Sequence, residues 1–427
     1  MSFRHAFHDE LSIVAGYWLG PNRHRYPAHR QRPARLSTKR GGAMQSAAAP
    51  RSKLHDVGTT IFTVIGQLAA EHQALNLSQG APNFAPDPAL VERVARAMRD
   101  GHNQYAPMAG VAALREALAV KTERLYGARY DPESEITVVA SASEGLYATI
   151  SALVHPGDEV IYFEPSFDSY APIVRLQGAT PVAISLSPER FRVNWDEVAA
   201  KITPRTRMLI VNTPHNPTAT IFGDADIARL AQLTEGTDIV ILSDEVYEHV
   251  VFDGARHHSM ARHRALAERS VIVSSFGKSY HVTGWRVGYC LAPVELTREL
   301  RKVHQFMTFA ADTPMQHAFA DALAEPSSYL ELGAFYERKR DLLVRELAGS
   351  RFELLPSEGS FFMLARFRHF SGESDADFVL RAIRDARVAT IPLSAFYADG
   401  ANTGCIRLSF SKDDATLIEG ARRLRSL

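Results

Sequence analysis

The sequence is poor in cysteine, has no long apolar run and carries no net charge. Its 427 residues include only Cys290 and Cys405, too few for a disulfide framework or a cysteine-based zinc site, and this thiol count suits a reducing compartment. No apolar stretch approaches the roughly 18 residues that a membrane-spanning helix needs. The 48 Lys and Arg residues balance 48 Asp and Glu residues, which gives no overall attraction to nucleic acid or to an anionic membrane. We therefore expect a soluble cytoplasmic protein without a nucleic-acid or membrane partner.

Several common catalytic motifs are also missing. No Gly-x-Gly-x-x-Gly fingerprint of a dinucleotide site follows an apolar run, and no nucleophile elbow is present. The triplet at 277–279 (GKS) resembles the end of a phosphate-binding P-loop, but that motif requires a glycine where Ile272 stands. His257, His258 and His263 have no accompanying cysteine or suitably spaced carboxylate. We therefore interpret them as solvated loop residues and expect no metal site.

The first 43 residues differ from the rest of the chain in charge. They contain seven Arg and one Lys against two acidic residues, a net charge of +6, so residues 44–427 carry −6. The segment can be read as a wrongly included or disordered stretch before a true start at Met44, as an ordered extension, or as a targeting segment. Its one apolar stretch is short and lacks a small-residue cleavage site, which argues against a secretory signal peptide. The fold prediction therefore begins after it.

From about residue 75 onward, short apolar runs alternate with amphipathic stretches. This alternation is typical of an α/β protein with a mostly parallel sheet covered by helices. Asp87 and Pro88 predict the start of one helix, and a second helix should run from Val111 to near Gly127. Five runs without polar alternation predict buried strands, at 136–139, 159–163, 208–211, 239–242 and 271–273.

The pattern changes toward the C-terminus. Residues 294–348 look helical, and strand-like pieces near 361, 388 and 405 with a terminal helix predict a smaller α+β domain. We therefore predict four parts. These are the extension at 1–43, an N-terminal arm at 44–74 that joins the small domain, a large domain at 75–305 and a small C-terminal domain at 306–427.

Polar residues directly follow four of the predicted strands. Because ligands of open α/β sheets bind at the carboxyl ends of the strands, these residues should be neighbours at one sheet edge. They lie in the segments 140–145 (ASASEG), 212–218 (NTPHNPT), 243–247 (SDEVY) and 274–279 (SSFGKS). A lysine that can form an imine, an aspartate that can pair with a ring nitrogen and a small-residue turn at a helix N-terminus together suit pyridoxal 5′-phosphate.

Residues 275–289 (SFGKSYHVTGWRVGY) closely resemble the lysine motif of the class I aminotransferases of fold-type I, which use this cofactor. Within that family the chain is most similar to the bacterial methionine aminotransferases, which are related to the kynurenine aminotransferases. The resemblance covers roughly 50–427, in order, with supporting segments at 76–80, 103–105, 164–168, 212–218, 243–248 and around Arg407. It implies a homodimeric transaminase that moves the α-amino group between an amino acid and a 2-oxo acid.

The resemblance also assigns a role to each matching residue. It implies that Lys278 binds the cofactor and moves the proton at the substrate α-carbon, and that Asp244 keeps the ring nitrogen protonated. Arg407 and the backbone of Gly80 would hold the substrate carboxylate, for which a guanidinium fork is well suited. The other matching positions are Ser141, Ala142, Ser143, Ser275 and Arg286 at the phosphate, Tyr247 at the phenolic oxygen, Asn216 at that oxygen and at the substrate, Phe167 on the ring, and Tyr105 reaching the phosphate across a dimer interface.

The resemblance to the family is less complete at the residues that would contact the substrate side chain. No second arginine is found for the distal carboxylate of aspartate or glutamate, so a bulky apolar, thioether or aromatic substrate is favoured. Ala81 stands where the relatives usually have an aromatic residue, which would enlarge or reshape the entrance, and Arg286 stands where the nearest ones often have lysine. The aromatic residues expected around the substrate are Phe84, Tyr105, Phe167 and Tyr280.

Two other functions are compatible with the same cofactor domain. One is kynurenine–oxoglutarate transamination with β-elimination from cysteine S-conjugates, an activity that the kynurenine aminotransferase relatives imply. The other is a ligand-sensing regulator that uses an aminotransferase-like domain and contacts DNA through its basic N-terminus. Such a regulator would need a helical DNA-binding domain upstream, and residues 1–43 show no helical period for one.

Overall fold

The computed structural model describes residues 51–427. The expectations for residues 1–43 and for a start at Met44 lie outside the described residues. Residues 51–59 form turns without a helix or strand. Residues 60–427 pack as one unit, which contains every element discussed below. No helix within residues 51–427 is both long enough and apolar enough to cross a membrane.

A seven-stranded sheet forms the centre of this unit, and its strand order is β2-β8-β7-β6-β5-β3-β4. All neighbouring strands are parallel except at β8, which is antiparallel to both β2 and β7. The five predicted strands are confirmed, and β4 and β8 are additional. The strands are β2 (Ile136–Val139), β3 (Glu159–Glu164), β4 (Thr180–Ser185), β5 (Thr206–Asn212), β6 (Val240–Asp244), β7 (Ser270–Ser275) and β8 (Gly288–Leu291).

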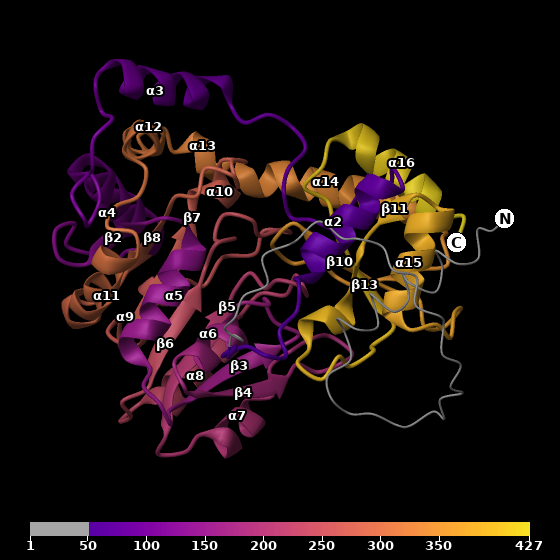
Figure 1. Ribbon diagram of the computed structural model, residues 1–427, viewed down its shortest axis with the longest axis horizontal. Helices are drawn as coiled ribbons and strands as arrows, with labels where there is room; N and C mark the ends of the chain where they lie inside the picture. The colour runs from indigo at the N-terminus through magenta and orange to yellow at the C-terminus, as the bar shows by residue number, and fades with distance from the viewer. Residues whose placement is uncertain (1–50) are drawn as a thin grey trace, which may run out of the picture. The chain divides into compact units, whose positions relative to one another are not determined.

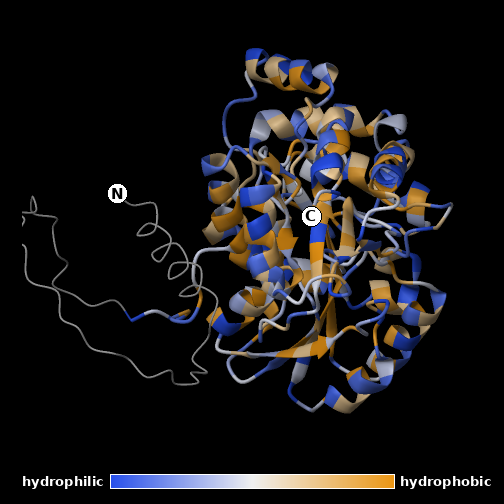
Figure 2. Cartoon of the chain, turned by 90° about the vertical axis from the view of Figure 1, so that its right-hand side faces the viewer, coloured by the Kyte–Doolittle hydropathy of each residue, from blue (hydrophilic) through white to orange (hydrophobic). Residues whose placement is uncertain are grey.

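Most of the helices of this part of the chain surround the sheet, while α3 (Pro88–Arg99) packs against α12 (Thr313–Leu323) (Figure 1), and the helix ends follow from local chemistry. The side chain of Asp87 accepts a hydrogen bond from Ala89 N (2.8 Å), and Pro88 occupies the first helical position of α3. Helix α4 ends at Gly127, which has a φ of 71° that glycine adopts without strain. Figure 2 shows mostly hydrophobic central strands and helices that alternate hydrophobic and hydrophilic residues. These helices are α3 (Pro88–Arg99), α4 (Ala112–Tyr126), α5 (Ala142–Leu153), α6 (Tyr170–Leu176), α7 (Trp195–Lys201), α8 (Asp224–Thr234), α9 (Arg264–Ala267), α10 (Phe276–Ser279), α11 (Val294–Met307) and α12 (Thr313–Leu323).

Two smaller sheets form from the C-terminal residues and from one N-terminal segment. The four-stranded sheet is antiparallel, with the order β12-β13-β10-β9. The other sheet pairs Leu75 with Val388 in parallel, and Figure 1 accordingly shows the indigo helix α2 beside the yellow C-terminal elements. The elements are α2 (Ile61–Glu71), β1 (Leu75–Asn76), α13 (Ser327–Leu330), α14 (Leu332–Leu347), β9 (Glu353–Leu354), β10 (Phe362–Arg366), α15 (Asp375–Asp385), β11 (Val388–Ala389), β12 (Ile391–Pro392), β13 (Cys405–Ser409) and α16 (Asp414–Leu424).

The predicted α/β class and the predicted smaller α+β elements are therefore present. The strand-like pieces near 361, 388 and 405 correspond to β10, β11 and β13, and the predicted terminal helix is α16. The proposed boundaries at 74, 305 and 306 between an arm, a large domain and a small domain stay predictions.

The register of the central sheet brings its polar strand ends into one row. Asn212 lies opposite Asp244, Asp244 lies opposite Val273, and Ser275 lies opposite Gly288. Gly288 also lies opposite Val139, the last residue of β2. The expectation that segments far apart in sequence meet at one edge of the sheet is thus confirmed.

Gly288 allows the turn before α5 to lie directly against this row. A Cβ atom at this position would be 2.6 Å from the carbonyl oxygen of Ser274 and 2.8 Å from the backbone nitrogen of Ala142. Either distance is shorter than a real contact of a side-chain carbon, so only glycine fits without a shift of the backbone. The small-residue turn at 140–143 is therefore held close to the ends of β7 and β8.

Candidate active site

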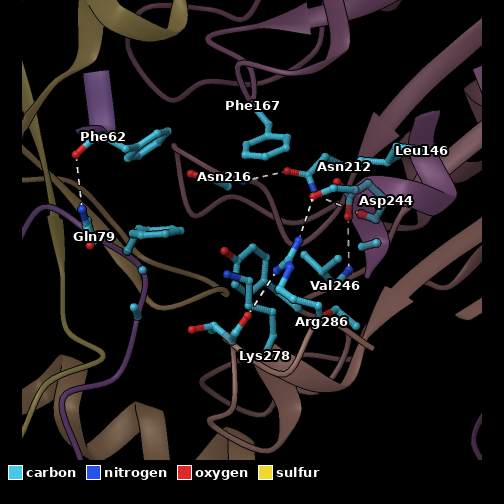
Figure 3. A pocket seen from close by; sticks show the side chains of 18 of the residues that line it. Phe62, Gln79, Leu146, Phe167, Asn212, Asn216, Asp244, Val246, Lys278 and Arg286 are labelled. Carbon is cyan, nitrogen blue, oxygen red and sulfur yellow. Dashed lines mark hydrogen bonds between the residues drawn. The ribbon is translucent and has the colours of Figure 1, made fainter. Parts of the chain in front are cut away.

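A cavity of about 420 Å³ opens at this edge of the sheet. Its size lies in the range of pockets that bind small molecules. Residues from the strand ends, from α2, from the segment 79–81 and from the C-terminal sheet all line it (Figure 3). The predicted site residues that line it are Gly80, Ala142, Ser143, Phe167, Asn216, Asp244, Tyr247, Ser275, Lys278, Arg286 and Arg407.

Lys278 lies in the short helix α10, directly after β7. The hydroxyl of Ser275 caps this helix by accepting a hydrogen bond from Gly277 N (3.2 Å). The Lys278 Nζ lies 5.9 Å from the ring centre of Tyr247 and 5.6 Å from that of Phe361. Burial, followed by the positive charges of Arg286 and Arg407, lowers the pKa of Lys278 to about 8. An appreciable fraction of this amine is therefore uncharged near neutral pH and can act as a nucleophile or a base.

Asp244 is the last residue of β6, and its side chain is buried. Its Oδ2 accepts a hydrogen bond from the hydroxyl of Tyr170 (2.7 Å), and its Oδ1 accepts one from Val246 N (3.3 Å). Burial raises the pKa of Asp244 to about 6, although both hydrogen bonds and Lys278 act in the opposite direction. A carboxylate held this way is suited to a partner that brings a positive charge, such as a protonated ring nitrogen.

The N-terminus of α5 and Arg286 form an anion-binding corner of the cavity. Ser141 is the N-cap residue of α5, with a φ of 87° and no capping hydrogen bond from its side chain, and Ala142 and Ser143 in the first turn line the cavity. Arg286 donates a hydrogen bond from Nη2 to the hydroxyl of Ser143 (3.4 Å) and one from Nη1 to the carbonyl of Thr283 (3.2 Å). Backbone N–H groups at a helix N-terminus, a hydroxyl and a guanidinium together suit a phosphate. Ser141 does not line the cavity, so its part in the corner is the backbone turn.

Arg407 comes from β13 of the C-terminal sheet and is almost completely buried. It donates a hydrogen bond from Nη1 to Oδ1 of Asn216 and one from Nη2 to the carbonyl of Ser78, both at 2.7 Å. Its Nε has no partner, so the guanidinium keeps unused donors inside the cavity. Burial lowers the pKa of Arg407 to about 9, while Tyr247 and Asp168 oppose the shift, so the group is charged at neutral pH. A charged donor with free hydrogen-bonding capacity suits a substrate carboxylate.

The aromatic lining differs from the prediction. Of the four expected aromatic residues only Phe167 lines the cavity, and Figure 3 shows its ring across the pocket from Lys278. Phe84 instead packs edge-on against His281 (4.9 Å between ring centres), and the hydroxyl of Tyr280 pairs with that of Ser328 (3.1 Å). Tyr105 is 86% exposed, so within this chain it does not reach the site.

Sequence reasoning missed two aromatic residues that line the cavity, Phe62 and Phe362. The ring centre of Phe362 lies 3.9 Å from Cζ of Arg407, and that of Phe62 lies 5.3 Å from it. Both rings flank the guanidinium and help to bury it. Neither residue follows a strand of the central sheet. Phe62 reaches the site from α2, and Phe362 reaches it from β10 of the C-terminal sheet. Three polar residues also line the cavity that lie in segments named above but had no assigned role, namely Gln79, Asn212 and Thr283.

The histidine cluster differs from its interpretation as a set of solvated loop residues. His257 and His258 are buried, and His257 Nε2 lies 2.8 Å from Oε2 of Glu245, a carboxylate 12 residues earlier in the chain. His258 and His263 stack with their ring centres 6.0 Å apart. Among residues 51–427 no group of three or more His, Cys, Asp or Glu side chains is arranged to hold a metal ion.

The donor set fits pyridoxal 5′-phosphate. A partly uncharged lysine can bind its aldehyde, a buried aspartate can pair with its ring nitrogen, and the corner at α5 can hold its phosphate. The buried and unpartnered Nε of Arg407 is the additional observation that points to a second, carboxylate-bearing ligand.

Comparisons with known proteins agree with this geometry. The sequence profile of the family described as aminotransferase class I and II matches residues 72–424. The methionine aminotransferase of Escherichia coli K12 is 53% identical over 379 residues, which are 88% of this chain and 98% of that protein. The human kynurenine–oxoglutarate transaminase 1 is 33% identical and covers 84% of this chain and 93% of its own length. A crystal structure from Escherichia coli, reported with a methionine aminotransferase function, has a TM-score of 0.87 at 52% identity and covers 89% of this chain and all of that one.

Proposed function

This chain belongs to the class I and II aminotransferases, which depend on pyridoxal 5′-phosphate, and we propose that it transfers amino groups from methionine-like L-amino acids to 2-oxo acids. The amino donors in this proposal carry an apolar, thioether or aromatic side chain. The single observation that carries it is the convergence of Lys278, Asp244 and Arg407 on one cavity. When bound, the cofactor supplies a conjugated ring that accepts the electron pair released as the substrate loses its α-proton.

The chain's own residues hold the reactants and move the proton. In this proposal Lys278 would hold the cofactor through its aldehyde, and the lysine amine would serve as the base and acid that moves the substrate α-proton. Asp244 would pair with the ring nitrogen, and Asn216 and Tyr247 would offer hydrogen-bond donors to the phenolic oxygen. The corner formed by α5 and Arg286 would hold the phosphate, and Phe167 would pack against the ring.

The cavity lining supports the choice of an apolar donor. Its cationic side chains are Lys278, Arg286 and Arg407, and each already has a role at the aldehyde, the phosphate or the α-carboxylate. No further arginine or lysine among the described lining residues is left for a distal carboxylate. The side chain of the substrate would instead meet apolar groups such as Phe62, Phe362 and Ala81, which favour burial of a hydrophobic or thioether chain.

We also propose that the enzyme is a homodimer in which Tyr105 reaches the phosphate of the partner's site. The support is an exposed aromatic surface, because Tyr105 is 86% exposed, Phe306 is 88% exposed, and Phe309 packs edge-on against Tyr105 at 5.6 Å. Exposed aromatic groups of this size are typical of interfaces. The expectation of a cytoplasmic location stays a prediction.

The decisive experiment is an amino-donor panel with purified enzyme. Methionine, leucine, phenylalanine, kynurenine, aspartate and glutamate are offered with 2-oxoglutarate or a thioether 2-oxo acid as acceptor, and product amino acid is measured. The proposal predicts higher kcat/KM for methionine and the aromatic donors than for aspartate, and a strong preference for aspartate would contradict it. Pyruvate and ammonia released from a cysteine conjugate without an acceptor would instead favour the β-elimination activity.

A further inference from the structure

Behind the cofactor side of the cavity lies a buried ion pair that none of the assigned roles uses. Lys121 of α4 donates a hydrogen bond from Nζ to Oε1 of Glu248 (2.8 Å), and both side chains are only 4% exposed. Removing two charges from water is costly, and a buried ion pair often stabilises a protein no more than apolar side chains would. The ion pair by itself is therefore weak evidence for a purely stabilising role, and it is embedded in a larger polar network.

The network satisfies both oxygens of the Glu248 carboxylate. Oε1 accepts hydrogen bonds from Lys121, from the hydroxyl of Ser274 (2.8 Å) and from the hydroxyl of Tyr289 (2.5 Å), and Oε2 accepts one from the hydroxyl of Tyr126. Lys121 also donates to Tyr289 (2.6 Å). Burial alone would raise the pKa of Glu248, but Lys121, His249 and the hydrogen bond from Tyr126 hold it well below its usual range. The carboxylate thus stays ionised and fixed.

This carboxylate joins α4 to three neighbouring strands of the central sheet. Lys121 and Tyr126 belong to α4, Ser274 belongs to β7, Tyr289 belongs to β8, and Glu248 follows β6. Glu248 is the neighbour of Tyr247, whose ring centre is 5.9 Å from Lys278 Nζ. Ser274 is the neighbour of Ser275, which caps the lysine helix. The network therefore fixes the chain at the residues next to Tyr247 and Ser275, which both line the cavity.

The backbone of the turn after β6 is also held by hydrogen bonds of its own. Glu248 N donates to the carbonyl of Glu245 (2.9 Å), and Val250 N donates to that of Tyr247 (2.8 Å). The ring of Tyr247 packs edge-on against Phe361, with 5.0 Å between the ring centres. The Glu248 carboxylate adds a side-chain restraint directly next to Tyr247, which ties this turn to α4, β7 and β8. The other titratable groups near the carboxylate are His249, whose Nε2 lies 3.8 Å from Oε1, and Glu245, which is paired with His257.

We propose that Lys121 and Glu248 are positioning residues, which set Tyr247 and Ser275 against the cofactor through the network with Tyr126, Tyr289 and Ser274. This inference rests on the proposed function, because it assumes that pyridoxal phosphate occupies the cavity. Neither residue contacts the reacting atoms. Their effect is on the geometry around Lys278, where a displacement of about 1 Å can change catalysis about a hundredfold.

The test compares wild-type holoenzyme with Lys121→Met, Glu248→Gln and the double variant Lys121→Met/Glu248→Met. Three properties are measured, namely the pH midpoint of the visible absorbance of bound cofactor, the rate of cofactor release on dilution and the melting temperature. Each single variant should shift the pH midpoint by at least about half a unit and release cofactor roughly tenfold faster on dilution. The double variant leaves no unpaired buried charge, so it should recover most of the melting temperature but not the wild-type midpoint.

Glu159→Gln is the matched control, because Glu159 is a mostly buried carboxylate at the opposite end of the same sheet, bonded to Thr203 (2.7 Å) and Arg205. It should lower the melting temperature without moving the midpoint. Should the single variants not fold, Tyr289→Phe removes only one hydroxyl, which donates to Glu248 and accepts from Lys121, and this variant must still shift the midpoint. A double variant with the wild-type midpoint would overturn the positioning role. Wild-type protein with no cofactor absorbance at all would instead overturn the proposed function.

Discussion

The two halves of the cavity are built in different ways. The cofactor half comes from loops at the ends of neighbouring strands of one sheet, so backbone hydrogen bonds fix Asp244 and Ser275 relative to each other. The substrate half comes from three separate segments, represented by Phe62 in α2, Ala81 and Arg407 in β13. A sheet edge gives precise spacing for chemistry, whereas separate segments can change independently. Specificity can therefore evolve in this fold without disturbing the reacting groups.

Both backbone and side-chain hydrogen bonds hold the segments of the substrate half together. Ser409 N in β13 donates to the carbonyl of Leu77 (2.8 Å). Arg407 donates to the carbonyl of Ser78, and Gln79 donates from Nε2 to that of Phe62 (3.2 Å). One bond, from Arg407 to Asn216, joins the two halves directly. Changes in the cofactor half should therefore affect all substrates alike, whereas changes in the substrate half should affect binding of the amino acid and leave the cofactor in place.

Lys278→Ala is the variant with the largest expected effect on activity. Loss of the amine removes both the covalent anchor and the proton carrier, so kcat/KM should fall by at least about 10⁴-fold for every donor. Stopped assays with the donor panel and a visible spectrum measure both consequences. The melting temperature of the cofactor-free protein should change little, because Lys278 makes no hydrogen bond or ion pair within the described residues. If activity persisted at the wild-type level, Lys278 would not be the catalytic residue.

Asp244→Asn tests the electrostatics of the cofactor half without a substrate. In the cofactor-free protein the folded-state pKa of about 6 exceeds the ordinary value of 3.8, so the folded state binds the proton more tightly. Stability should then fall as the pH rises from about 4 to about 6, by up to roughly 3 kcal/mol. The stability of Asp244→Asn should not show this fall, because asparagine does not titrate.

Urea denaturation of both cofactor-free proteins at pH 4 and pH 7 measures the difference. The variant should gain stability relative to wild type at pH 7 and not at pH 4. An equal difference at the two pH values would show that Asp244 is not held with a raised pKa.

Arg407→Lys tests whether the substrate half of the cavity can be changed without affecting the cofactor half. Lysine keeps the charge but loses the planar fork, so kcat/KM for amino acids should fall about a hundredfold while the cofactor spectrum is retained. Arg366→Lys serves as the control and should leave kcat/KM unchanged, because Arg366 lies in the neighbouring strand β10 and pairs with Glu353 outside the cavity. Loss of bound cofactor in Arg407→Lys would show that the two halves are not separable.

Phe62→Ala should have the smallest of these effects. Removal of one wall of the substrate half should raise KM for methionine and phenylalanine about tenfold, with little change in kcat, because contacts with the cofactor are untouched. Phe84→Ala is a matched control, since Phe84 packs against Phe335 and does not line the cavity. A larger effect of the control than of Phe62→Ala would contradict the assignment of the substrate half.

The difference between the cofactor half and the substrate half of the cavity also explains which site residues could be predicted from the sequence. Asp244 and Lys278 directly follow apolar runs, and the rule that ligands bind at strand ends is enough to group them from the sequence alone. Phe62 was missed because it lies in an amphipathic helix whose placement depends on the pairing of β1 with β11. Phe84 was wrongly expected in the cavity, because proximity to the segment 76–80 in sequence does not fix the side of the chain on which a side chain lies. Strand β8 was missed because its four residues lie at the end of the lysine motif and just beyond it.

The reversed direction of β8 has one more consequence. Arg286 precedes β8 whereas Lys278 follows β7, so a single connection, closed by bonds such as that from Val282 N to the carbonyl of Gly277 (3.1 Å), links the two. The proposed sites for the aldehyde and the phosphate are thus eight residues apart on one continuous stretch of backbone. The length of that stretch therefore sets the distance between the group that would hold the cofactor aldehyde and the group that would hold its phosphate. Insertions are tolerated in many surface loops, but here an added residue would separate the two ends of the ligand's binding site.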